Sequence, residues 1–316
     1  MSRGAVLVGI DQYAVRPLKG CEADATALGN LLKRHADESA NFQRLLILSS
    51  EEKVTKSKLV AMINEIFSNK NADVALFYFA GHGAFTKNGG YLVTQDGQAH
   101  DEGVPMAQVI TAANRSPSRE KIIILDCCHA GAIDELFASE MNLPLAQGVS
   151  ILAGCRTDQL AAEKGNRGLF TTLICDAIAG AAADLRGFVT VPAIYAYADE
   201  MLTLFDQRPL LKTNVSQLVP LRRASPAMPD DILRKLVEYF PSPDYAFPLD
   251  CSFEPTEPPP NPKNEAIFAD LQRFRAARLV VPDGEEHLYY AAINSKSCSL
   301  TLLGRSYWHA VKKHKI

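Results

Sequence analysis

The sequence lacks features that would mark a membrane, secreted or nucleic-acid-binding protein. No unbroken run of about 18 apolar residues occurs, so no membrane-spanning helix is expected. The formal net charge is only -3, which gives the whole chain no strong attraction to nucleic acid or to an anionic membrane. The first apolar run ends at Asp11 without a small-residue cleavage site, which favours a strand over a signal peptide. We therefore expect a cytoplasmic protein with no membrane partner, and nucleic acid is not an expected partner.

A regular cysteine framework is also missing. The seven cysteines are odd in number and scattered along the chain, so we expect reduced thiols, one of which could be a reactive thiolate. The chain is too long for one average domain at 316 residues, and 47% of its residues are apolar. Such a chain suits two domains and can bury a substantial core.

Short apolar runs alternate with helical patterns through the first two-thirds of the sequence. This order predicts a mostly parallel six-stranded sheet sandwiched by helices, in the α/β class. The strands are expected near residues 5–10, 44–48, 73–79, 121–125, 149–153 and 217–221, with a short extra strand at 91–93. The helices are expected near residues 22–35, 56–67, 106–113, 169–179 and 194–205.

The composition changes after residue 224. A short helix over 230–240 and a proline-dense stretch over 242–262 predict a helix and a stiff linker across 225–262. Residues 263–316 predict a small winged-helix-like domain, with a helix, a hairpin over 280–294 that turns at Asp283-Gly284, and a closing helix. The expected domains are therefore 1–224, 225–262 and 263–316.

Two segments place histidine and cysteine directly after predicted strands. FAGHG (79–83) ends one strand and LDCCHAG (125–131) ends another. Ligands of open α/β sheets bind outside the carboxyl ends of the strands. If the two strands are neighbours, a histidine and a cysteine meet at one edge of the sheet.

The residue types in these segments suit nucleophilic catalysis. An imidazole can take the proton of a nearby thiol, and the backbone N–H groups of Gly83 and Cys128 could stabilise an oxyanion. A helix over 130–138 would add the favourable dipole of its N-terminus. Taken singly, a Gly-His-Gly segment is more often a structural turn, and a Cys-Cys pair at a strand end is more often buried core, than part of a catalytic site. A zinc site is disfavoured because adjacent residues do not readily converge on one metal.

The two segments together resemble the caspase-like clan of cysteine peptidases, and most of all the metacaspases and their prokaryotic relatives. These carry a histidine in a GHG-type turn and a cysteine in a D-x-C-H-S-G-type turn, which implies a catalytic dyad of His82 and Cys128. Cys127 would then be a strand-end core residue, and Ala130 stands where serine is usual. The resemblance extends over about residues 3–224, through LKGCEADA (18–25), ILAGCRTD (151–158) and GLFT (168–171).

The resemblance also implies an acidic S1 pocket that takes Arg or Lys. Asp24 and Asp126 match the pocket acids of the family, and two carboxylates beside an uncharged groove favour a basic side chain. The structural alternatives are a helix N-terminal charge for Asp24 and a turn residue for Asp126. An aspartate-specific pocket would call for arginines at these positions. We therefore expect an endopeptidase that cleaves protein substrates after Arg or Lys.

No cofactor is expected. Some metacaspases bind calcium through acidic clusters, but the loop over 87–95 lacks a pair of carboxylates. Asp134 and Glu135 follow the cysteine and do not by themselves support a calcium site.

The connection after the catalytic cysteine contains no basic residue. From His129 to Cys155 there is neither Lys nor Arg, although many relatives are cut in this span during maturation. An enzyme specific for basic residues cannot cut itself there. The sequence therefore predicts an active form made of one uncut chain.

By analogy with bacterial caspase-like proteins, the chain would act in a stress, antiphage or cell-death pathway, activated by a partner or signal. The C-terminal module would then bind a regulatory protein; its basic tail is mild support for an anionic partner. Two alternatives stay open. One is a DNA- or protein-binding regulator that uses the caspase-like domain as a scaffold, and the other is a cysteine-dependent acyl transferase or hydrolase of small substrates.

Overall fold

The computed structural model describes residues 1–87, 89–127, 144–154, 167–203 and 208–316. These divide into two compact units, Met1–Ser225 and Pro226–Ile316. Each unit is described by itself.

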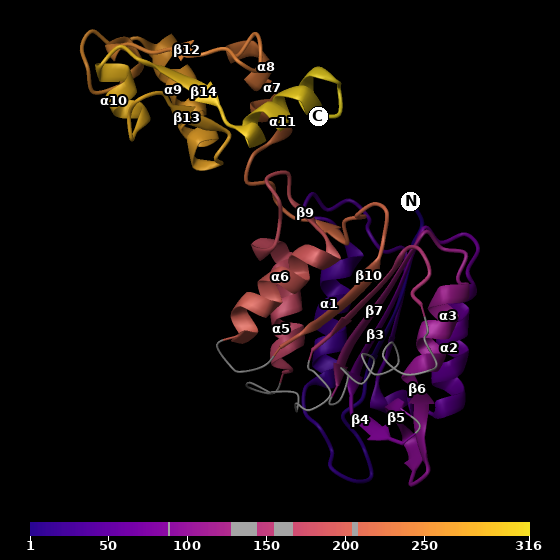
Figure 1. Cartoon of the computed structure of the whole chain (residues 1–316). Helices are drawn as coiled ribbons and strands as arrows, with labels where there is room; N and C mark the ends of the chain where they lie inside the picture. Colours follow the sequence, from indigo (N-terminus) through magenta and orange to yellow (C-terminus); the bar gives the residue numbers. More distant parts are fainter. Residues whose placement is uncertain (88, 128–143, 155–166, 204–207) are drawn as a thin grey trace. The chain divides into compact units, whose positions relative to one another are not determined.

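A six-stranded sheet forms the centre of the first unit (Figure 1). Its strand order is β10-β8-β7-β3-β1-β2, with five parallel strands and β10 antiparallel to β8. The α/β fold with a mostly parallel six-stranded sheet is thus confirmed. The strands are β1 (Arg3–Gly9), β2 (Arg44–Leu48), β3 (Val74–Gly81), β7 (Glu120–Cys127), β8 (Val149–Ala153) and β10 (Leu210–Asn214).

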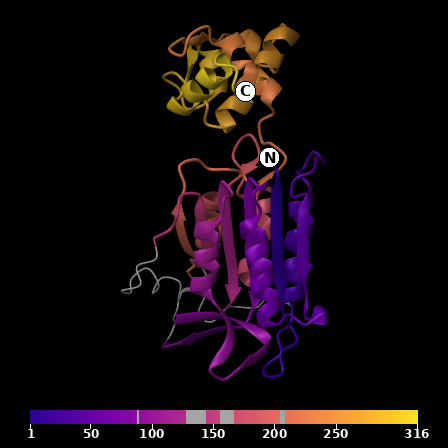
Figure 2. The same cartoon turned by 90° about the vertical axis from the view of Figure 1, so that its right-hand side faces the viewer.

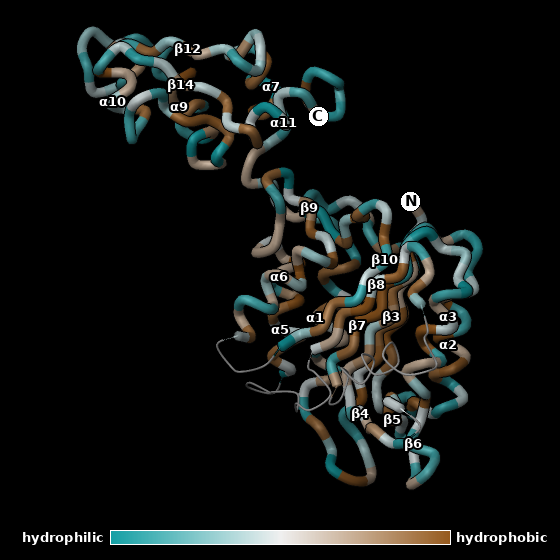
Figure 3. Tube along the Cα trace, viewed as in Figure 1, coloured by the Kyte–Doolittle hydropathy of each residue, from teal (hydrophilic) through white to brown (hydrophobic). Residues whose placement is uncertain are grey.

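Helices cover both faces of this sheet (Figure 2). One face carries α1 (Cys21–Lys33), α5 (Leu169–Asp176) and α6 (Val191–Leu202), and the other carries α2 (Lys56–Ser68) and α3 (Met106–Arg115). Successive side chains of a strand point to opposite faces, so Val6 and Val8 join one core while Ala5 and Leu7 join the other. Burial on both sides explains why the central strands are continuous apolar runs, which form the brown bands of Figure 3.

The sixth strand does not lie where the sequence predicted it. The expected span was 217–221, and the structure forms β10 over Leu210–Asn214 instead. Pro220 cannot donate a backbone hydrogen bond, which makes 217–221 a poor strand despite its apolar residues. Because β10 is a half-exposed edge strand, it lacks the continuous apolar pattern of its neighbours.

A small antiparallel sheet follows β3 at the carboxyl ends of the parallel strands (Figure 1). It contains β4 (Gly83–Thr86), β5 (Gly89–Gln98) and β6 (Asp101–Pro105). The sequence predicted only the middle of β5. The remaining short elements of the first unit are η1 (Ser50–Glu52), the π-helical turn η3 (Ala177–Ala181), and the paired strands β9 (Phe188–Val189) and β11 (Arg222–Arg223).

The second unit has its own apolar core, which includes Phe240, Phe274 and Trp308. The indole N–H of Trp308 donates to the carbonyl oxygen of Phe240 over 2.6 Å. A three-stranded antiparallel sheet has the order β12-β14-β13. The elements of the second unit are α7 (Asp230–Arg234), α8 (Leu236–Tyr239), β12 (Phe247–Pro248), η5 (Cys251–Phe253), α9 (Pro262–Ala276), β13 (Val280–Pro282), α10 (Leu288–Ile293), β14 (Ser297–Leu300) and α11 (Leu302–Lys312).

Two details of this unit differ from the sequence predictions. The hairpin expected over 280–294 is not formed, because Leu288, Ala291 and Ala292 have helical spacing and are buried in α10. The partner of β13 is β14 instead, so the order is helix, strand, helix, strand, helix. Part of the segment expected to be a linker is folded into the unit, since β12 pairs with β14 and Leu249 is buried.

Within the described ranges, none of the helices combines the length and the apolar character needed to cross a membrane.

Candidate active site

The two strands that carry the histidine and cysteine motifs are neighbours. β3 and β7 are parallel, and their last paired residues are Ala80 with Asp126 and Gly81 with Cys127. His82 therefore follows one member of the final pair, and Cys128 follows the other in sequence. Cys128 itself and the helix predicted at 130–138 lie outside the described residues.

Gly81 allows a tyrosine to approach the histidine. A Cβ atom at Gly81 would lie 2.4 Å from the hydroxyl oxygen of Tyr13, so only glycine leaves room for that hydroxyl. The Tyr13 hydroxyl accepts a 3.0 Å hydrogen bond from the backbone N–H of His82 and donates one to the carbonyl oxygen of Val93. The rings of Tyr13 and His82 also pack together, with centroids 4.6 Å apart. Tyr13 thus holds both the backbone and the ring of His82.

A backbone carbonyl determines which ring nitrogen of His82 carries a proton. Nε2 lies 2.6 Å from the carbonyl oxygen of Arg16, which can only accept a hydrogen bond. The proton is therefore on Nε2, and Nδ1 is the nitrogen left to take a proton from a substrate or a neighbouring group. Arg16 has φ 56, a left-handed conformation that is uncommon for a residue other than glycine and is concentrated at functional sites.

Asp11 anchors the loop that carries Tyr13 and Arg16. Its carboxylate accepts hydrogen bonds from the backbone N–H groups of Gly20, Cys21 and Glu22, at 2.8 to 3.4 Å. These groups belong to the start of α1, whose N-cap residue Gly20 has no side chain to serve them. One carboxylate at the end of β1 therefore joins the loop to the first turn of α1.

Asp24 lies in the first turn of α1 and is almost fully buried, with 1% of its side chain exposed. Its Oδ2 accepts a 2.7 Å hydrogen bond from the backbone N–H of Gly168, and its Oδ1 accepts a 2.9 Å bond from Nε of Arg167. Burial raises the pKa of Asp24, whereas the Gly168 N–H and the Arg167 guanidinium lower it.

Asp126 approaches the same helix end from β7. Its Oδ2 accepts hydrogen bonds from the hydroxyl and the backbone N–H of Thr171, over 2.6 and 3.2 Å. The Thr171 hydroxyl also bonds the buried hydroxyl of Tyr78 on β3. The backbone N–H groups at the start of α5 are thus served by carboxylates from two other elements.

Gly168 lies between the two carboxylates. A Cβ atom there would be 2.5 Å from Oδ2 of Asp126 and 3.0 Å from Oδ2 of Asp24. The two acids that the sequence assigned to an S1 pocket are therefore close together. In this structure both also stabilise the N-terminus of α5, a structural role that the sequence did not suggest for either residue.

The remaining site residues are placed as follows. Gly83 is the first residue of β4 and pairs with Leu92 of β5. Cys127 is buried within β7, with 1% of its surface exposed. Burial raises the pKa of the half-buried Cys21, which lies beside these acids, and disfavours its thiolate. Among the described cysteines, Cys251 in the second unit is the exposed one.

Three contributors to this site escaped the sequence analysis. Arg16 acts through its backbone carbonyl, which is independent of residue type and leaves no motif. Tyr13 contacts the histidine from a loop 69 residues away in sequence. Arg167 lies directly before the GLFT segment, but one basic residue in a loop gives no indication of its partner.

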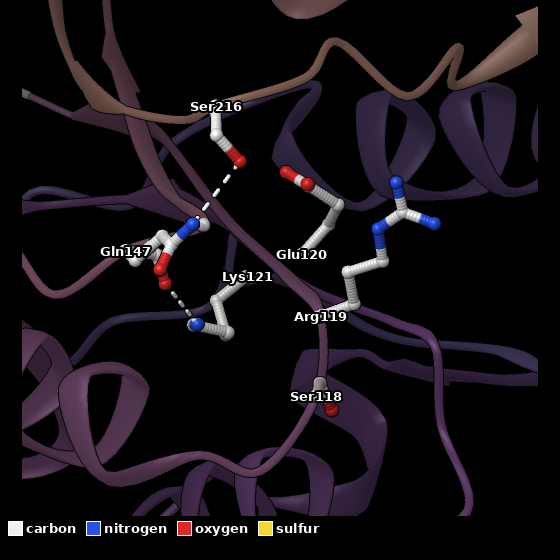
Figure 4. Close-up of a pocket in the computed structure, with 7 residues that line it drawn as sticks. Ser118, Arg119, Glu120, Lys121, Gln147 and Ser216 are labelled. Carbon is white, nitrogen blue, oxygen red and sulfur yellow. Dashed lines mark hydrogen bonds between the residues drawn. The ribbon is translucent and has the colours of Figure 1, made fainter.

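A separate hollow of about 320 Å³ lies at the opposite end of the sheet, near the first residues of β7 and β8 (Figure 4). Its polar groups bond one another, since the Lys121 ammonium donates to the Gln147 carbonyl and the Gln147 amide donates to Ser216. It is not part of the site around His82. Over the described parts of the chain, no group of three or more His, Cys, Asp or Glu side chains is arranged to hold a metal ion.

Comparisons with known proteins give one family and solved structures of similar fold. A family model described as "Caspase domain" matches residues 2–219. A structural-genomics target from Geobacter sulfurreducens is 14% identical, with a TM-score of 0.52 over 72% of this chain and 98% of its own. Caspase-1 from Spodoptera frugiperda is 12% identical, with a TM-score of 0.51 over 70% of this chain and 90% of its own. No curated protein matches the sequence.

Proposed function

This chain belongs to the caspase domain family of cysteine peptidases, and we propose that it is an endopeptidase that cleaves proteins after Arg or Lys. The observation that carries the proposal is the register of β3 and β7, which pairs Gly81 with Cys127. Adjacent strands lie about 4.8 Å apart. His82 directly follows Gly81, and Cys128 directly follows Cys127 in the sequence. This connection to neighbouring strand ends supports proton transfer between the imidazole and the thiol.

In the proposed mechanism His82 is the base and Cys128 the nucleophile. Nδ1 of His82 takes the thiol proton, and the thiolate sulfur attacks the scissile carbonyl carbon. The backbone N–H groups of Gly83 and Cys128 stabilise the resulting oxyanion. The imidazolium returns the proton to the departing amine, which leaves a thioester on Cys128. A water molecule, deprotonated by His82, then hydrolyses the thioester and restores the thiol.

Asp24 and Asp126 form the S1 pocket in this proposal. The proximity of their carboxylates around Gly168 supports it, because a basic side chain gains most from two nearby acceptors with fixed positions. The contact between Asp24 and Arg167 adds support, since a guanidinium of this chain already reaches one of these carboxylates.

Control of the activity is assigned to the second unit and to a cytoplasmic protein partner. That unit has its own core, and the site residues considered above all belong to the first unit. A bacterial stress, antiphage or cell-death pathway is consistent with such an arrangement.

Hydrolysis of fluorogenic peptides tests the proposal. The full chain is assayed with peptides that differ only in Arg, Lys, Asp or Ala at the cleaved position. We expect cleavage of the Arg and Lys peptides, a loss of at least about a thousandfold in Cys128→Ala, and activity retained in the matched variant Cys127→Ala. Equal activity of Cys128→Ala and the wild type would contradict the proposal and favour the scaffold alternative. Hydrolysis of small esters without peptide cleavage would favour the third alternative.

A further inference from the structure

A basic side chain of the chain itself occupies the acidic site beside Gly168. Nε of Arg167 donates to Oδ1 of Asp24 over 2.9 Å, and Nη2 of Arg167 lies 3.7 Å from the sulfur of Cys175. Arg167 directly precedes Gly168, the residue around which the carboxylates of Asp24 and Asp126 gather. Its guanidinium therefore sits where the proposed S1 pocket would receive the guanidinium of a substrate.

The ion pair between Arg167 and Asp24 has one hydrogen bond, which makes it weaker than an arginine–carboxylate pair with two. Arg and carboxylate pair best through two parallel hydrogen bonds. Here Oδ2 of Asp24 is occupied by the Gly168 N–H, and the other described acceptor of Arg167 is a sulfur atom, which accepts only weakly. The two partners also differ in exposure, because 35% of the Arg167 side chain is exposed against 1% of Asp24. The side chain of Arg167 therefore borders solvent, whereas that of Asp24 does not.

Asp24 does not depend on Arg167 alone. The Gly168 N–H donates to Oδ2 independently of the arginine, and this bond also lowers the pKa of Asp24. Removing Arg167 would leave a buried carboxylate with one fixed donor and one vacant acceptor, Oδ1. A buried carboxylate in that condition favours a new cationic partner.

We propose that Arg167 is a built-in competitor of the substrate, which occupies the S1 site of the resting chain and must leave before a basic side chain can bind. The inference rests on the proposed function, because it assigns the competitor to the same pocket. The apparent affinity for a basic substrate is then lowered by the fraction of time for which Arg167 holds Asp24. An occupancy near nine-tenths would lower it about tenfold.

The test is the variant Arg167→Ala, assayed at pH 8 with the Arg reporter peptide. We expect KM to fall about tenfold with kcat within about twofold, because the competitor is removed and the dyad is untouched. If Arg167 instead positions Asp24 for the substrate, KM rises or kcat falls, and an unchanged KM equally overturns the proposal. Should Arg167→Ala fail to fold, Arg167→Gln removes the charge while keeping a donor.

The matched control is Lys235→Ala in the second unit. Lys235 also pairs with a buried aspartate, with 34% of its side chain exposed against 7% of Asp270. This variant loses an ion pair between a half-exposed base and a buried aspartate in the other unit, and its KM is expected to equal that of the wild type. A fall in KM in both variants would attribute the effect to loosening of the fold and would overturn the proposal.

Binding of benzamidine separates this inference from the proposed function. Benzamidine mimics an arginine side chain, and its affinity is measured by calorimetry in Cys128→Ala and in Cys128→Ala/Arg167→Ala. Suppose that neither the wild type nor Arg167→Ala cleaves a peptide, but Cys128→Ala/Arg167→Ala binds benzamidine about tenfold more tightly than Cys128→Ala. The proposed peptidase function then fails, and the proposal that Arg167 competes for the acidic site stands. If cleavage occurs and the affinities are equal, the competitor fails and the peptidase stands. If there is neither cleavage nor binding, both fail.

Discussion

At the scale of single residues, the candidate site depends on how the neighbours of His82 and Asp24 restrict them. His82 has its tautomer set by the Arg16 carbonyl and its position set by Tyr13. Asp24 is buried and has its acceptors satisfied by Arg167 and Gly168. Conservative changes to these neighbours should therefore alter activity without removing any group that reacts.

Tyr13→Phe tests the support of His82. The change removes one hydroxyl that accepts from the His82 N–H and donates to the Val93 carbonyl. We expect kcat/KM for the Arg reporter to fall roughly fivefold, the equivalent of about 1 kcal/mol for a lost hydrogen bond. The matched control is Tyr197→Phe, which removes a hydroxyl bonded to Asp176 on the surface. Equal effects of the two variants would show that Tyr13 has no particular role at His82.

The pH dependence of Arg167→Ala tests the electrostatics of Asp24. Burial raises the pKa of Asp24, and Arg167 opposes this rise in the free protein. Without Arg167 the pKa is higher, so a larger share of Asp24 is neutral on the acid side, and neutral Asp24 cannot pair with a basic substrate. We therefore expect the acidic limb of the kcat/KM profile to shift to higher pH in Arg167→Ala. A limb that coincides with that of the wild type, or moves to lower pH, contradicts this description of Asp24.

At the scale of elements, the central sheet could be predicted from the sequence because its inner strands are buried on both faces. A short, continuous, β-branched apolar run such as KIIIL in β7 is typical of a parallel strand that is buried on both faces. The edge strand β10 and the helix α10 were mispredicted for different reasons. β10 has too little burial to show a clear apolar pattern, and α10 is too short, at six residues, for its helical spacing to stand out in the sequence.

The sequence predicted the parts of the candidate site that depend on the identity of a side chain, and not those that depend on the backbone or on loop folding. The GHG and DCC motifs identified the strand ends, and the register of β3 and β7 then joined them. The Arg16 carbonyl and the partner of Asp24 could not be inferred, because both depend on how a loop folds back on the sheet. Loops of this kind carry few residues whose type dictates the contact.

Asp11→Ala tests how one element supports the site. Asp11 caps α1 from the end of β1 and anchors the loop that brings Arg16 to His82. Loss of such a cap costs about 1 kcal/mol, which corresponds to roughly 2–4 °C in Tm for a unit of this size. We expect a lower Tm together with lower kcat, whereas Asp11→Asn retains an acceptor and keeps most of both. A fall in Tm with an unchanged kcat would separate the cap from the site.

At the scale of the whole molecule, the chain combines a caspase-fold unit with a second unit that has its own core. The proposed chemistry involves the first unit alone. The described site residues come from β3, β4, β7, α1 and α5 and from the loops between the elements of this unit, so an uncut chain contains the parts that the mechanism needs.

The absence of Lys and Arg from His129 to Cys155 predicts that the active enzyme remains one chain. Much of this span lies outside the described residues, and the prediction rests on sequence and on the proposed specificity. Purified active protein should give a single intact mass close to 34.5 kDa before and after prolonged incubation. Fragments that begin or end between residues 129 and 155 would show that the chain is cut there and that the prediction is wrong.

The central claim is that Cys128, adjacent to the buried Cys127, is the nucleophile of a peptidase for basic residues. Its most direct measurement is covalent capture with a peptide that carries Arg followed by an electrophilic ketone, with the adduct located by tandem mass spectrometry. We predict one adduct per chain, on Cys128, with no adduct from the matching Asp peptide. An adduct on Cys127 or on the exposed Cys251, or no adduct from a protein that still cleaves the Arg reporter, would contradict the claim.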